Sequence, residues 1–282
     1  MTQFFYGFLI FLLFTLRPFV YKKAARVLTP NASSIFTAFW SVLVSIIFLP
    51  FFIDVTKSDF IPNIGLIGSI IKGFCIFQLI KNSQILNKES TSASVAWGPI
   101  VLALAALFNF IFLGEILSAQ QLITIFVLFA IGLLFFFITE YKTLSIKARK
   151  AFFTILFVVI INIICDKFAL NHISWYIHLF LTYISMLIFA LISKIEKEDL
   201  VSCIKEKDTW IAGIIYALGE IIVIMAMQKI FNNVSVCIFI IRIAQAFDLI
   251  LAYHIYKEGK ISWQYLFAII QIISFYFFFF KY

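Results

Sequence analysis

Long apolar stretches separated by short polar connections set the pattern of this chain. Ten stretches of mainly apolar residues can be counted, each bounded by charged residues or by clusters of Pro, Asn and Gly. They cover residues 4–21, 34–53, 64–85, 93–113, 120–139, 152–170, 175–193, 210–229, 235–253 and 263–280. Roughly 20 apolar residues in a helix cross a bilayer, whereas barrel strands would alternate over about 10 residues. The pattern therefore predicts an all-α integral membrane protein with ten transmembrane helices.

The composition supports this class and excludes a soluble domain. Hydrophobic residues make up 63% of the chain and the mean hydropathy is +1.07, more than a soluble domain can bury. The net charge of +8 comes from Lys and Arg in short connections, where orientation in the membrane explains them. We therefore expect the lipid bilayer and a small-molecule substrate as partners, and no nucleic acid.

The chain resembles one unit written twice. Ser92 precedes Glu115 by 23 positions and Ser235 precedes Glu258 by the same 23, so a single offset of 143 superposes both pairs. Five apolar stretches fall in each half, with a short basic junction at 140–150. We expect two inverted five-helix repeats, residues 1–145 and 146–282.

The distribution of basic residues predicts an orientation. Of the 22 Lys and Arg residues, 15 lie in the odd-numbered connections, 4 on the other side and 3 within the stretches. The positive-inside tendency then places both termini outside the cytoplasm.

Charged residues within the apolar stretches are the strongest candidates for function. Each costs about 2.5 to 3.5 kcal/mol on insertion scales, so Arg242 and Asp248 together nearly cancel the apolar residues of the ninth stretch. That stretch must face protein or water. The predicted substrate-binding residues are Arg242, Lys72, Glu220, Tyr216, Gln245, Trp97 and Ser235. The predicted coupling or proton-carrying residues are Glu220, Asp248 and Asp166.

A purely structural interpretation stays open for several of these charges. Arg242 can pair with Glu220 or Asp248 as a buried ion pair, because pairing alone offsets the cost of burial. Arg17, followed by Pro18, closes the first stretch in this interpretation, and both Arg17 and Asp166 lie close enough to the ends of their stretches to reach the interface.

Cysteine and histidine give no sign of a metal site, cofactor or catalytic centre. The four cysteines, Cys75, Cys165, Cys203 and Cys237, lie far apart with no CxxC pattern. The three histidines, His172, His178 and His254, lie near the ends of stretches or among aromatic residues. We expect no metal, no cofactor and no enzymatic activity.

Several motifs carry a family resemblance. The run STSASVA at 90–96, Pro99, FLGE at 112–115 and a Gln-Leu start to the next helix resemble the EamA repeat of the drug/metabolite transporter superfamily. The second copy, with NNVSV at 232–236, Lys257-Glu258 and SWQYL at 262–266, is similar but lacks the proline and the glycine. The resemblance implies an inverted-repeat carrier of the bacterial inner membrane, with a central cavity lined largely by the third, fourth, eighth and ninth helices. It also implies termini in the cytoplasm, opposite to the charge count.

Three functions follow as hypotheses. The first is a secondary transporter of a small polar metabolite, an amino acid or related zwitterion, working by alternating access. The second is a proton-coupled exporter of lipophilic cations, in which the acidic groups exchange protons for drug. The third is a membrane enzyme acting on a lipid-linked substrate, for which we find no paired aspartates at the spacing of prenyl chemistry. The sequence leaves the substrate, direction, coupling ion and a possible homodimer undecided.

Overall fold

The computed structural model describes residues 2–48, 63–112, 118–193, 201, 207–230, 234–258 and 260–279. Within these ranges the chain forms ten α-helices and two short π-helical segments, and no strand. In chain order they are α1 (Thr2–Val27), α2 (Pro30–Phe48), α3 (Ile64–Glu89), α4 (Thr91–Phe112), α5 (Ala119–Phe135), η3 (Phe136–Glu140), α6 (Ile146–Leu170), α7 (Trp175–Ile192), α9 (Lys207–Met225), η4 (Ala226–Ile230), α10 (Val234–Tyr256) and α11 (Ile261–Phe279). The helical class predicted from the sequence is confirmed.

The helices have the length and surface of membrane-crossing segments. Among the described residues, eight helical stretches are long and apolar enough to cross a membrane, and α11 contains a shorter apolar stretch, Ile261–Ser274. Large apolar side chains point outward, with Phe4 81%, Phe157 67% and Ile192 75% exposed. Such a surface is unfavourable in water, whereas lipid tails cover it without penalty. The described fold therefore fits a multi-pass membrane protein.

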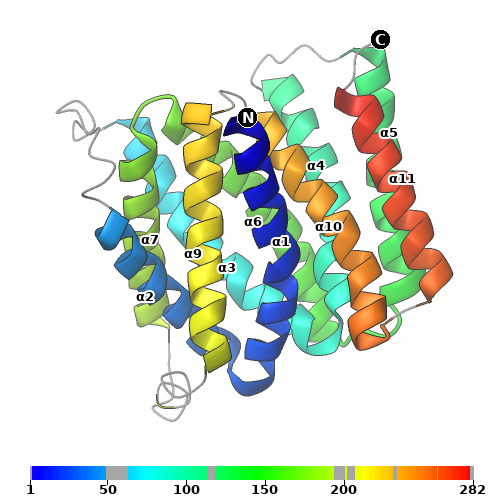
Figure 1. Cartoon of the computed structure of the whole chain (residues 1–282), viewed down its shortest axis with the longest axis horizontal. Helices are drawn as coiled ribbons and strands as arrows, with labels where there is room; N and C mark the ends of the chain where they lie inside the picture. Colours follow the sequence, from blue (N-terminus) through cyan, green and yellow to red (C-terminus); the bar gives the residue numbers. More distant parts are fainter. Residues whose placement is uncertain are drawn as a thin grey trace.

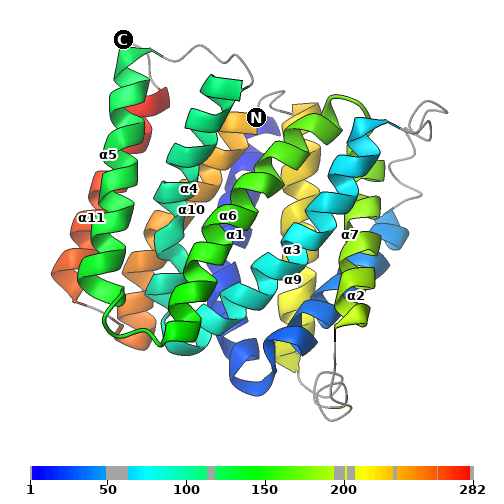
Figure 2. The same ribbon diagram turned by 180° about the vertical axis from the view of Figure 1, so that it is seen from behind.

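The helices stand side by side in one bundle (Figures 1 and 2). Helices α4, α5, α10 and α11 lie together at one end, α2, α7 and α9 at the other, and α1 and α6 lie between them. The two halves of the chain interleave, because α1 packs against α9 and α10, while α3 packs against α6 and α7. Helix α1 begins and α11 ends on the same side of the bundle.

Helix positions recur along the chain at the offset found in the sequence. Shifting α1 by 143 positions gives 145–170, against Ile146–Leu170 for α6, and shifting α4 gives 234–255, against Val234–Tyr256 for α10. The starts of α2 and α7, of α3 and α9, and of α5 and α11 agree within two residues in the same way. The described helices of the second half therefore begin at nearly the same relative positions as those of the first half.

Short polar side chains fix several helix ends. The Asn63 side chain accepts hydrogen bonds from the backbone N–H groups of Gly65 and Leu66 at the start of α3. Ser118 and Gln121 form a capping box at the start of α5, which satisfies N–H groups that have no partner within the helix. At the end of α10, Lys257 adopts the left-handed conformation with φ of 57°. The position 143 residues earlier is Gly114, the residue type that adopts this conformation at lowest cost.

The first helix differs from the expectation that Arg17 and Pro18 end it. Helix α1 contains Pro18 and continues to Val27. Proline inside a membrane helix is tolerated when neighbouring helices satisfy the carbonyl it frees. Arg17 therefore lies within α1, ten residues before its last residue.

A close approach between α3 and α7 depends on Gly73. A Cβ atom at this position would lie 2.5 Å from Ser185 Cβ and 2.6 Å from the backbone oxygen of Thr182. We expect Gly73→Ala to lower the free energy of unfolding by about 1–3 kcal/mol, because the two helices would have to move apart. Titration of the purified protein with SDS measures this. Gly219→Ala is the control, since its added Cβ meets Phe14 at an ordinary 3.5 Å, and equal stability of the two variants would contradict the prediction.

Candidate functional site

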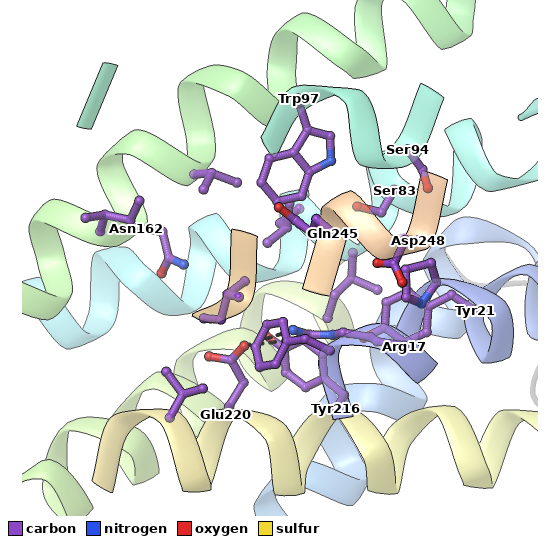
Figure 3. Close-up of a pocket in the computed structure, with 18 of the residues that line it drawn as sticks. Arg17, Tyr21, Ser83, Ser94, Trp97, Asn162, Tyr216, Glu220, Gln245 and Asp248 are labelled. Atoms are coloured by element: carbon purple, nitrogen blue, oxygen red, sulfur yellow. Dashed lines mark hydrogen bonds and ion pairs between the residues drawn. The ribbon is translucent and has the colours of Figure 1, made fainter. Parts of the chain in front are cut away.

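A cavity lies between the two halves of the chain and encloses about 140 Å³. Its walls come from α1, α3 and α4 of the first half and from α6, α9, η4 and α10 of the second. The wall-forming α-helices of one half are the equivalents of those of the other at the offset of 143. Polar side chains reach the cavity from six helices. They are Arg17, Ser83, Ser94, Asn162, Glu220, Gln245 and Asp248, which Figure 3 labels.

An ion pair between the two halves forms part of the cavity wall. Both terminal nitrogens of the Arg17 guanidinium donate to Glu220 Oε1 at 3.2 Å, and Arg17 Nε donates to the Tyr21 hydroxyl at 3.3 Å. The side chains of Arg17 and Glu220 are only 15% and 14% exposed. Within the described residues nothing donates to Glu220 Oε2. The pair therefore keeps one oxygen available to a ligand.

Aromatic rings hold the Arg17 guanidinium in place. Its central carbon lies 4.0 Å from the centroid of the Tyr216 ring and 4.9 Å from that of Phe14. A guanidinium stacked on aromatic faces is stabilised by cation–π attraction and loses little freedom when it binds a carboxylate. Trp97 faces this group from the opposite wall (Figure 3). The cavity thus combines one ordered cation with apolar aromatic surface.

A second ion pair between the halves borders the cavity. Lys72 Nζ, on α3, is paired with Asp166 Oδ1, on α6, and the Lys72 side chain is fully buried. His178 Nε2, on α7, lies 2.8 Å from the same Asp166 oxygen, and Ser69 Oγ lies 2.8 Å from His178 Nδ1. Asp166 also lines the cavity, whereas Lys72 and His178 do not. The carboxylate therefore connects the cavity to a buried group of charges.

Asp248 has no hydrogen-bond partner in the part of the cavity wall that the structure describes. It is 0% exposed, and neither of its carboxylate oxygens has a hydrogen-bond partner among the described residues. Burying an unpaired carboxylate costs several kcal/mol. A proton or a cationic group of a ligand would consequently find a favourable position beside it.

The described residues contain no group of three or more His, Cys, Asp or Glu side chains that could hold a metal ion. The thiols of Cys75, Cys165 and Cys237 are buried and free.

The comparisons with known proteins bear on the fold. Neither a protein-family model nor a curated protein sequence matches this chain. A solved structure described as the crystal structure of a protein has the same helix arrangement, with a TM-score of 0.65 over 98% of this chain and 96% of that chain. The sequence identity is 8%, so this likeness concerns the fold alone. Function has to be argued from the residues of the cavity.

The structure brings most of the predicted site residues together. Those that line the cavity are Trp97, Asp166, Tyr216, Glu220, Gln245 and Asp248. Lys72 lies behind the wall and is engaged by Asp166. Arg242 and Ser235 belong to α10, but their side chains lie outside the described part of the structure.

Arg17 and His178, which both contact a carboxylate at the site, were not among the predicted site residues. Arg17 was placed at the end of its helix, although the Lys22-Lys23 pair that follows it already indicated a later helix end. His178 was grouped with the aromatic residues of its stretch. It lies about as far after the connection between α6 and α7 as Asp166 lies before it, which in antiparallel helices indicates a similar depth in the bundle.

Proposed function

We propose that this protein is a secondary transporter of a small zwitterion, such as an amino acid, that works by alternating access. In this proposal all ten helices cross a bacterial inner membrane as two inverted repeats of the EamA type, residues 1–145 and 146–282. The recurrence of helix starts at the offset of 143 supports the repeats. A cavity with equivalent helices from both halves in its walls is what a carrier with opposed repeats requires.

The observation that carries the proposal is the Arg17–Glu220 pair in the cavity wall, with Asp248, which has no partner among the described residues, in the same cavity. A substrate carboxylate would compete with Glu220 for Arg17, whose planar guanidinium suits a carboxylate. The substrate ammonium would bind Glu220 Oε2 or Asp248. A zwitterion therefore replaces one internal ion pair with two ion pairs to the substrate.

The cavity favours this substrate class over the lipophilic cations of the second hypothesis. A volume of about 140 Å³ is small beside the roughly 300–1,000 Å³ typical of sites for drug-sized ligands. A lipophilic cation that took Glu220 from Arg17 would also leave the Arg17 guanidinium without an anionic partner. Both points support a small ligand that carries its own negative charge.

The proposal is tested by uptake into vesicles that contain the purified protein. We expect vesicles preloaded with unlabelled amino acids to exchange at least one of a set of ¹⁴C-labelled amino acids, recovered chemically unchanged. Arg17→Ala and Glu220→Ala should each lower the initial rate roughly tenfold or more, because each removes one charge-assisted contact worth about 1.5–3 kcal/mol.

Matched controls separate substrate binding from a general loss of structure. Arg149→Ala removes an arginine that is also stacked on a tyrosine, 4.3 Å from the Tyr141 ring centroid, but does not line the cavity. Glu89→Gln removes an exposed carboxylate hydrogen-bonded to Ser145. Both should exchange at close to the wild-type rate. Unchanged exchange by a combined Arg242→Ala and Glu220→Ala variant, or transport restricted to lipophilic cations, would refute the proposed site.

A further inference from the structure

A buried cluster next to the cavity joins both halves of the chain. It comprises Ser69 and Lys72 of α3, Asp166 of α6 and His178 of α7, hereafter the Asp166–His178 cluster. Ser69, Lys72 and His178 are 0% exposed, and Asp166 is 6% exposed. Asp166 is the member that also lines the cavity. A change of charge in the cluster therefore changes the electrostatic potential at the cavity wall.

The hydrogen bonds of the cluster can accommodate one additional proton. Ser69 Oγ lies 2.8 Å from His178 Nδ1 and also 2.8 Å from the backbone oxygen of Gly65, but a hydroxyl has only one proton to donate. With a neutral imidazole, His178 Nε2–H donates to Asp166 and the Ser69 hydroxyl donates to Nδ1. With a protonated imidazole, Nδ1–H donates to Ser69 and the Ser69 hydroxyl turns to the Gly65 oxygen.

Both arrangements satisfy each polar atom without moving a heavy atom. The Gly65 oxygen is an acceptor that α3 itself can satisfy, so it gains a bond in one state and loses none in the other. Adding the proton forms one N–H bond at Nδ1 and breaks one O–H bond of a hydronium ion from the more acidic side of the membrane. Within the protein no other covalent bond forms or breaks.

The charges around His178 make this proton dependent on what occupies the cavity. Helix α6 presents Asp166 and α3 presents Lys72, while α9 contributes the charge of Glu220, which Arg17 engages. Helix α2, which also packs against α7, contains no ionisable side chain. With neutral His178 the Lys72–Asp166 pair has no net charge, and with protonated His178 the cluster carries one positive charge. An anionic group in the cavity would offset that charge.

We propose that the Asp166–His178 cluster is a proton-binding site that couples proton entry to substrate entry. The proposal rests on the transport function proposed above. A proton on His178 and a substrate carboxylate in the cavity bind more tightly together than apart, so both cross the membrane in the same direction. Lys72 and Ser69 are positioning residues: Lys72 holds the Asp166 carboxylate, and Ser69 exchanges its hydroxyl proton between two acceptors.

Proton binding is tested directly with ¹⁵N-histidine-labelled full-length protein. The chain has only three histidines, and His172→Gln, His178→Gln and His254→Gln assign their ¹⁵N signals. We expect the His178 signals to change between pH 8 and pH 5 from one neutral tautomer to an imidazolium with both nitrogens protonated. A His178 that keeps one neutral tautomer over this range overturns the proposal, whatever the transport assay shows.

Coupling is tested by imposing a pH gradient on the vesicles used for amino-acid exchange. One proton moved per substrate allows a gradient of one pH unit to sustain up to about tenfold accumulation. The wild type, His172→Gln and His254→Gln should accumulate substrate when the outside is acidic, whereas His178→Gln should show no dependence on the gradient at any absolute rate. Gradient-independent wild-type uptake, or accumulation that persists in His178→Gln, overturns the coupling.

The two assays also separate this proposal from the transport function. If the wild type exchanges no amino acid, the proposed function fails, and the NMR titration still decides whether His178 binds a proton. If amino acids exchange but the gradient has no effect, transport stands and the coupling fails.

Discussion

Lys72→Met is expected to lower the free energy of unfolding by about 3 to 5 kcal/mol, since it leaves a buried carboxylate without its cation. The Lys72 side chain is fully buried and its ammonium is paired with Asp166. Methionine fills a similar volume, so the loss reports the charge and not a cavity. Titration with SDS measures the effect in the purified protein.

A second substitution distinguishes loss of the charge from loss of packing. Lys72→Met combined with Asp166→Asn removes both charges, keeps the shape, and leaves an amide that can still accept a hydrogen bond from His178. We expect the double variant to regain most of the lost stability, because a neutral pair avoids the desolvation penalty. Lys23→Met, at an exposed position of α1, is the control and should change stability by less than about 0.5 kcal/mol. A double variant as unstable as Lys72→Met would contradict the electrostatic explanation.

The two ion pairs beside the cavity have opposite polarity. In one, the third helix of the first half supplies the cation, Lys72, and the first helix of the second half supplies Asp166. In the other, the first helix of the first half supplies the cation, Arg17, and the third helix of the second half supplies Glu220. The same pair of helix positions is therefore used twice with the charges exchanged. Both pairs connect the halves, so a movement of one half relative to the other changes the environment of both ion pairs.

The positions of the helices followed well from the sequence, because the bilayer requires long apolar stretches and the hydropathy pattern records them. Helix ends followed less well. Helix α1 runs past Pro18 to Val27, since neighbouring helices can satisfy a freed carbonyl and nothing local reports that. The π-helical segments Phe136–Glu140 and Ala226–Ile230 also left no sign in the pattern.

The candidate site followed from the sequence in part. The rule that a charge within a membrane helix is functional pointed to Glu220, Asp166 and Asp248, which line the cavity. It could not assign partners, because pairing depends on how helices distant in sequence pack. The sequence therefore offered Arg242 as the partner of Glu220 or Asp248, whereas among the described side chains Glu220 pairs with Arg17, 203 positions away in the chain.

Glu258→Ala is expected to open the side of the cavity where α4 begins and α10 ends. Glu258 Oε2 accepts hydrogen bonds from the backbone N–H groups of Thr91 at 2.7 Å and Ser92 at 3.2 Å, and Oε1 is paired with Lys22. A carboxylate at the start of a helix also interacts favourably with the helix dipole. All three partners belong to the first half of the chain and Glu258 to the second. The halves cannot separate on this side until these bonds break.

The opening is measured by thiol labelling at the cavity. In a variant whose native cysteines are replaced by alanine, Asn87→Cys places a thiol in the cavity wall. Losing charge-assisted bonds worth about 1.5–3 kcal/mol should raise its labelling rate roughly ten- to a hundredfold. Glu140→Gln is the matched control, because this buried carboxylate accepts from Ser90 Oγ at 2.8 Å within the same half. If Glu258→Ala leaves the labelling rate unchanged, or Glu140→Gln raises it equally, these bonds do not hold the halves together, since only contacts between the halves can oppose their separation.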